Sequence, residues 1–164
     1  MTGAERGTLT HRILSLMSLG RLREGPMRDA IQYEVHSMVE RGIISSEELM
    51  MLPMRSIEQF YQSELGQRIL RSPEVKREWS FNLRMDDGVT LLQGVIDCAF
   101  REGDAWIVLD YKTDRIDDEE AFVTRYAPQI NWYARALEQI TRRPAAEMWL
   151  YALSTGKAYA VESC

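Results

Sequence analysis

Two aspartates and a lysine lie in apolar segments in the second half of the chain. Asp97 follows Val95-Ile96, and Asp110 and Lys112 follow the run Trp106-Ile107-Val108-Leu109. Carboxylates are rarely buried without a partner, so we expect these two, which lie in apolar segments, to have a charged or metal partner. A carboxylate pair suits a hard divalent cation such as Mg²⁺, and a lysine beside it can offset charge on a phosphoryl group during hydrolysis. These residue types therefore point to metal-assisted phosphoryl transfer.

A tight hairpin between the two segments would bring the aspartates together. Gly103-Asp104 has a favoured composition for a two-residue hairpin loop, which pairs Glu102 with Ala105. Five residues further from the loop on each strand, the same register pairs Asp97 with Asp110. Directly opposite side chains share one face, with Cβ atoms about 4.5–5.5 Å apart. We therefore expect the two carboxylates to lie side by side.

Lys112 would point to the same face, because alternate residues of a strand do so. Two like charges at this separation need a cation or a shared proton between them. A surface carboxylate pair offset by the lysine is the simpler interpretation, but the flanking apolar runs argue against free exposure, so we expect a metal site. A one-residue slip in the pairing would put the aspartates on opposite faces and remove the basis for this prediction.

The elements that must position these residues follow from hydrophobic spacing. Apolar residues at helical spacing predict several short helices in the first half of the chain. Four features set the limits of these helices: stops at Gly20 and Gly42, an N-cap at Ser45 and a break at Pro53.

Beyond Pro73 the pattern changes to that of strands. Strands are predicted at residues 78–83, 89–100, 106–109, 148–153 and 158–161. Gly94 predicts a bend or bulge in the second of them. An apolar stripe from Phe122 to Ile140 predicts a long helix that begins at Pro128 or is kinked there. This order of elements predicts a mixed α/β fold with a helical N-terminal region.

Composition narrows the class of protein. A chain of 164 residues suits one domain, and its net charge of −5 excludes a binder that holds nucleic acid through a basic tail. No apolar run approaches the roughly 20 residues that span a bilayer. The N-terminus has no signal-peptide core, and only Cys98 and Cys164 are present. We expect a cytoplasmic protein without a disulfide framework.

Several segments, in this order, resemble the RecB-like branch of the PD-(D/E)XK nuclease superfamily, and most of all the nuclease domain of AddA-type helicase–nucleases. The segments that carry the core motifs are Gly94–Asp97, Leu109–Asp114 and Gln129–Tyr133. Those that resemble the branch's histidine motif and the lead-in to its first core strand are Gly7–His11, Phe60–Arg68 and Arg77–Phe81. The resemblance covers nearly the whole chain. It departs from the pattern in lacking the superfamily's usual proline at its nominal place and the iron–sulfur cysteines of some relatives.

The resemblance implies a fold and a set of site residues. It implies a restriction-endonuclease-like central sheet with flanking helices, in a single domain of residues 1–164. In it, residues 1–72 form a helical region with the histidine motif and residues 73–164 form the nuclease core. The implied metal ligands are His11, Asp97, Asp110 and the backbone carbonyl of Tyr111, and the implied catalytic residues are Asp97, Asp110 and Lys112. Gln129 and Tyr133 would position DNA. Apart from the resemblance, Glu78 alternates with Trp79 and Phe81 along its strand, which favours a place near the ligands over a ligand role.

The implied activity is that of a DNA exonuclease that depends on Mg²⁺ or Mn²⁺ and has no iron–sulfur cluster. It would act in double-strand-break repair and recombination on single-stranded DNA delivered by a helicase. ATP would serve only that helicase, outside this chain, an AddB-like subunit would be the partner, and no membrane would be involved. Two alternatives stay open: a catalytically inert nuclease-fold module for DNA binding or docking, and a stand-alone small RecB-like exonuclease.

Overall fold

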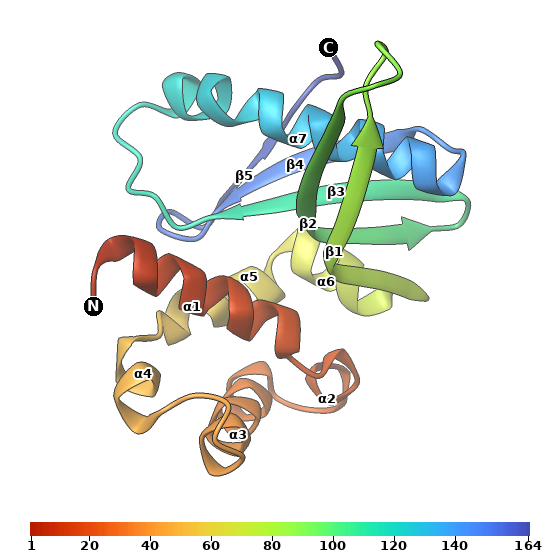
Figure 1. The fold of residues 1–164 in the computed structure, drawn as a ribbon. Coiled ribbons are helices and arrows are strands. Elements are labelled where there is room, and N and C mark those ends of the chain that lie inside the picture. The colour runs from red at the N-terminus through yellow and green to blue at the C-terminus, as the bar shows by residue number, and fades with distance from the viewer. The chain divides into compact units, whose positions relative to one another are not determined.

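A computed structural model describes residues 1–164 as two compact units, Met1–Arg71 and Ser72–Cys164. Figure 1 labels the elements of both units. The N-terminal unit consists of the helices α1 (Gly3–Leu16), α2 (Leu19–Glu24), α3 (Met27–Glu40), α4 (Ser46–Met51), α5 (Met54–Gln62) and α6 (Glu64–Arg71). No helix of the chain combines the length and the apolar character that crossing a membrane requires.

Side-chain caps start several helices in the N-terminal unit. Ser45 caps α4 in a capping box with Glu48, as its position predicts, and Pro53 separates α4 from α5. The predicted stop at Gly20 is wrong, because this glycine lies inside α2. The break comes earlier, where the Ser18 hydroxyl accepts a hydrogen bond from the Arg21 N–H and starts a new helix.

Gly66 lies where two helices of this unit meet closely. A Cβ built on Gly66 would overlap the Phe60 carbonyl oxygen and come within 2.6 Å of the Tyr61 Cα. Both contacts are with backbone, which cannot turn aside as a side-chain tip does. The close approach of α5 and α6 therefore requires glycine at this position.

We expect Gly66→Ala to lower the free energy of unfolding by about 1–3 kcal/mol, the usual range for overpacking. Gly20→Ala is the matched control, because Gly20 is also helical but a Cβ there would meet only the Ser18 Oγ, at 3.9 Å. That control should stabilise the chain by roughly 0.5–1 kcal/mol through helix propensity. Urea denaturation of both variants checks the pair, and equal effects of the two substitutions would contradict the close-packing argument.

The C-terminal unit is a five-stranded sheet in the order β1-β2-β3-β4-β5, with one long helix. Its elements are β1 (Glu74–Arg84), β2 (Leu91–Glu102), β3 (Ala105–Lys112), α7 (Glu119–Thr141), β4 (Ala145–Ala152) and β5 (Lys157–Ala160). Neighbouring strands are antiparallel except β3 and β4, which are parallel and joined by α7. The helix lies across one face of the sheet (Figure 1), and Ile130 and Leu137 pack there against strand residues such as Val108. The predicted order of elements and the mixed α/β class are confirmed.

Two local predictions in this unit need correction. Pairing stays in register through Gly94, which lies opposite Phe81, and a Cβ at Gly94 would meet the Phe81 ring at 2.6 Å. This glycine makes room for an aromatic ring and does not mark a bulge. Of the two alternatives for the long helix, a start at Pro128 is excluded, because α7 begins nine residues earlier, at Glu119, with Asp118 as its N-cap and Pro128 inside it. Pro128 is tolerated inside α7 on the exposed side, where the carbonyl four residues before it can turn to water.

Candidate functional site

The β2–β3 hairpin turns at Gly103-Asp104 and fixes the register of the candidate carboxylates. Glu102 pairs with Ala105, and the ladder continues without a shift to Cys98 opposite Leu109. The observed register is the one predicted from the loop as far as Cys98 opposite Leu109. Asp97 and Asp110 are the next residues along the two strands, and their carboxyl groups lie within hydrogen-bonding reach of each other.

Asp110 is a buried carboxyl next to a second one. Its side chain is 2% exposed, and it lies within hydrogen-bonding reach of the Asp97 carboxylate. Burial, followed by the hydrogen bond with Asp97 and the charge of that carboxylate, raises the pKa of Asp110 to about 8. One Asp97 oxygen, Oδ2, accepts a hydrogen bond from the Tyr111 N–H at 3.0 Å. Without a cation, burial and the neighbouring carboxylate therefore disfavour the ionised form of Asp110.

Lys112, the last residue of β3, contacts the carboxyl group of Asp110. Its Nζ lies 2.9 Å from Asp110 Oδ2, a charge contact that opposes the effect of burial on the pKa of Asp110. This buried oxygen is not satisfied by a hydrogen bond of regular geometry. The ammonium donates instead to Gln129 Oε1 at 2.7 Å. The three residues of the Asp97, Asp110 and Lys112 set are thus on one face, as the strand spacing predicts.

Helix α7 adds two predicted residues, Gln129 and Tyr133, to this site. Burial, and then the charges of Asp110, Asp97 and Glu78, raise the pKa of the Tyr133 hydroxyl, to which Gln129 makes a hydrogen bond. The hydroxyl therefore stays protonated and can act as a donor. Gln129 contacts Lys112 directly, so it is placed to orient the lysine, and its role toward DNA stays a prediction.

The aromatic ring of Tyr126 also belongs to this cluster, and sequence reasoning missed it. Lys112 Nζ lies 4.2 Å from the centre of the Tyr126 ring, and the Tyr126 hydroxyl donates to Asp114 Oδ2 at 2.5 Å. A signal was present, because Tyr126, Gln129 and Tyr133 follow one another at spacings of three and four, which gives them one helix face.

Glu78 stands opposite Asp97 on β1. Arg77 pairs with Cys98 and Trp79 with Ile96, so the step between them falls on Glu78 and Asp97, and regular pairing is interrupted there. Glu78 has a φ of +51°, which non-glycine residues rarely adopt, in the middle of a strand. The strand irregularity therefore lies at this step, next to the carboxylate pair, and not at Gly94.

His11 lies on α1 in the N-terminal unit. Its Nδ1 lies 2.9 Å from the Gly7 carbonyl oxygen, a contact that suits a protonated Nδ1 and puts the lone pair of the neutral ring on Nε2. This is the tautomer that a metal ligand through Nε2 requires. The ligand role of His11 stays a prediction.

The Asp97–Asp110 pair fits a divalent cation. A buried carboxylate oxygen without a hydrogen bond, beside a second carboxylate, is a position that a cation would satisfy. No group of three or more His, Cys, Asp or Glu side chains surrounds one point. Two carboxylates agree with the chemistry of Mg²⁺, which keeps several waters and commonly takes one or two carboxylates together with substrate phosphates.

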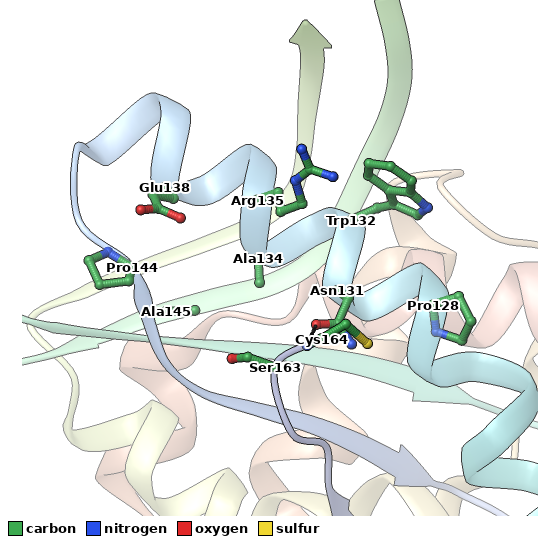
Figure 2. Close-up of a pocket in the computed structure, with 10 residues that line it drawn as sticks. All are labelled: Pro128, Asn131, Trp132, Ala134, Arg135, Glu138, Pro144, Ala145, Ser163 and Cys164. Carbon is green, nitrogen blue, oxygen red and sulfur yellow. Dashed lines mark hydrogen bonds between the residues drawn. The ribbon is translucent and has the colours of Figure 1, made fainter. Parts of the chain in front are cut away.

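A separate cavity of about 340 Å³ lies between α7, the start of β4 and the C-terminal tail (Figure 2). The Arg135 guanidinium lies 4.8 Å from the centre of the Trp132 ring at this cavity. None of the predicted site residues lines it. The candidate site is therefore a carboxylate pair on the neighbouring strands β2 and β3, and it does not share lining residues with this cavity.

Comparison with known proteins agrees with this geometry. The family model described as the PD-(D/E)XK nuclease superfamily matches residues 1–163. The chain is 31% identical over 170 residues to an ATP-dependent helicase/nuclease subunit from Desulforamulus reducens, covering 96% of this chain and 13% of the relative. It is 31% identical over 177 residues to the protein of the same name from Clostridium acetobutylicum, covering 99% and 14%. The chain therefore spans only about an eighth of the length of these relatives. With a match over almost its whole length and the carboxylates and lysine together on a mixed sheet, this chain belongs to the PD-(D/E)XK nuclease superfamily.

Proposed function

We propose that this chain is a divalent-metal-dependent deoxyribonuclease that hydrolyses phosphodiester bonds as an exonuclease. The observation that carries the proposal is the buried Asp110 carboxyl, held between Asp97 and the Lys112 ammonium on the β2–β3 hairpin. Two carboxylates placed against each other cost folding free energy unless a cation binds or the two share a proton, so a bound cation would stabilise this arrangement.

In this proposal Asp97 and Asp110 hold Mg²⁺ or Mn²⁺, together with His11 and the Tyr111 carbonyl. When bound, such a cation polarises a phosphoryl oxygen and lowers the pKa of a coordinated water. Lys112 presents its ammonium beside the carboxylates, where it can orient the attacking water and offset negative charge at the phosphorus. Gln129 holds the lysine tip, and Tyr133 offers its protonated hydroxyl to the DNA strand. Glu78 adds negative charge at the edge of the site.

The biological setting rests on the relatives. The proteins from Desulforamulus reducens and Clostridium acetobutylicum are named helicase/nuclease subunits, so we propose single-stranded DNA, delivered by a helicase, as the substrate. In this setting ATP serves the helicase alone, and no iron–sulfur cluster is needed. An AddB-like subunit is the partner. The nuclease acts in the cytoplasm, in the repair and recombination of double-strand breaks.

The test is digestion of end-labelled DNA by the purified chain, with single- and double-stranded substrates of the same sequence. Cleavage of the single strand in Mg²⁺ or Mn²⁺, and none in a chelator, is the expected result. Metal-independent cleavage would contradict the metal role, and no cleavage by a chain that binds Mn²⁺ would favour the inert module.

Binding of DNA by the isolated chain is expected to be weak and sensitive to salt. With a net charge of −5, the chain has little surplus positive charge with which to release counterions from DNA. We expect a Kd for single-stranded DNA of about 10⁻⁴–10⁻⁶ M near physiological salt, the usual range for non-specific contacts. Fluorescence anisotropy over a salt series in chelator measures it, and a tight complex that persists at high salt would contradict this view.

A further inference from the structure

The ammonium group of Lys112 is held on three sides, and one of those sides is an aromatic ring. Asp110 Oδ2 lies 2.9 Å from Nζ, Gln129 Oε1 accepts from it at 2.7 Å, and the centre of the Tyr126 ring is 4.2 Å away. A lysine side chain has four flexible bonds, so it would otherwise sample many positions. The ring face carries the negative part of the aromatic quadrupole and attracts the ammonium.

Tyr126 is itself fixed at its far end. Its hydroxyl donates to Asp114 Oδ2 at 2.5 Å, and Asp114 in turn accepts a hydrogen bond at its backbone carbonyl from Ser154 Oγ at 2.6 Å. Burial, followed by the Asp114 carboxylate, raises the pKa of Tyr126, so the hydroxyl stays a donor. Asp114 follows Lys112 by two residues in the chain. Lys112 contacts the Tyr126 ring, and the Tyr126 hydroxyl contacts Asp114, so Tyr126 is tied to the same short segment that carries the lysine.

We propose that Tyr126 is a positioning residue for Lys112: its ring holds the lysine ammonium between Asp110 and Gln129, and its hydroxyl, bonded to Asp114, holds the ring in place. The consequence for DNA cleavage rests on the proposed function, in which Lys112 acts at the phosphoryl group. The placement of the ammonium itself is a property of the metal-free chain and does not depend on that function.

A role in packing alone is the competing explanation. The Tyr126 ring also packs against Phe122, with ring centres 5.3 Å apart, and Phe122 packs in the same way against Tyr159 at 5.5 Å. Tyr159 therefore offers a matched control. Tyr159→Leu also removes a tyrosine ring from this aromatic cluster, but it leaves the Tyr126 ring beside Lys112 in place.

The experiment measures the order parameter of the Lys112 ammonium by ¹⁵N relaxation in the metal-free chain, together with kcat and KM for single-stranded DNA in Mg²⁺. Tyr126→Leu should lower the order parameter clearly and reduce kcat by about 10–100-fold, the scale of a misplaced catalytic group, with KM changed by less than about threefold. Tyr126→Phe keeps the ring and should restore most of both quantities. Tyr159→Leu should leave the order parameter at the parent value.

A further variant separates the ring from its anchor and does not disturb the aromatic cluster. Asp114→Ala breaks the hydroxyl contact while keeping the ring, so its order parameter should lie between those of the parent and Tyr126→Leu, close to that of Tyr126→Phe. An unchanged order parameter in Tyr126→Leu, or an equal loss in Tyr159→Leu, would overturn the proposal. If the parent chain cleaves no DNA, the proposed function fails, and the order parameters still decide whether Tyr126 positions the lysine.

Discussion

Asp110→Asn and Lys112→Ala should each reduce DNA cleavage by at least about a thousandfold, since each removes a group that acts on charge at the reacting phosphate. The amide of the first variant cannot carry the negative charge that a cation needs, and the second variant has no ammonium at this place. Asp110→Asn should fold normally, because the amide has the shape of the protonated carboxyl that a pKa of about 8 implies. Initial rates on a labelled single strand, at saturating Mg²⁺, measure both variants.

Matched controls come from the same unit. Asp104→Asn changes an aspartate at the tip of the β2–β3 hairpin, which pairs only with Arg143 at the surface. Lys157→Ala removes an exposed lysine of β5 that pairs with Glu119. Both controls should keep cleavage within about twofold of the parent, as surface pairs contribute little. Parent-like cleavage by Asp110→Asn or Lys112→Ala would refute the assignment of those residues.

The second large effect is on stability as a function of pH. Asp110 has a folded-state pKa of about 8, raised by burial and by Asp97, against about 4 in an unfolded chain. The folded state therefore binds the proton more tightly, and its contribution is fully present below about pH 4 and lost as pH rises through 8. The free energy of unfolding of the metal-free chain should fall by up to about 1.4 kcal/mol per pH unit in this window from Asp110 alone.

The contribution of Asp110 is isolated by comparing the parent with Asp110→Asn in chelator from pH 4.5 to 9. The variant should be close to the parent at low pH and increasingly more stable above neutral pH, because it cannot ionise. Mg²⁺ should restore stability to the parent at pH 8 and leave the variant unchanged, since the cation requires the ionised carboxylate. Parallel pH profiles of the two proteins in chelator would show that Asp110 is not the buried, proton-holding group described above.

The register of the site could be predicted because a local rule controls it. Gly103-Asp104 favours a two-residue loop, and the alternation of strand side chains then places Asp97, Asp110 and Lys112 on one face. The order of helices and strands followed from hydrophobic spacing for the same reason, since the pattern of each segment depends on neighbours in sequence. Ser45 and Pro53 act through their own backbone and side-chain chemistry and were predicted as well.

The remaining features depend on contacts between segments far apart in sequence. Gly94 leaves space for Phe81 on the neighbouring strand, and the pattern of β2 alone cannot show which ring fills that space. Ser18 and Gly20 are both residues at which a helix can start or stop, and the sequence alone does not decide between them. In the structure Ser18 caps the start of α2, so Gly20 lies inside that helix. The spacing of Tyr126 from Gln129 shows that they share a helix face, but the contact of Tyr126 with Lys112 depends on how α7 packs on the sheet.

The central claim is that Asp97 and Asp110 together bind a divalent cation. Calorimetric titration of Mn²⁺ into the metal-free chain at pH 8 tests it most directly, with Asp110→Asn measured in parallel. We expect saturable binding to the parent, accompanied by proton release, and binding at least about tenfold weaker in the variant, the loss that ordinary changes at a metal site produce. No binding to the parent, or equal binding to Asp110→Asn, would contradict it.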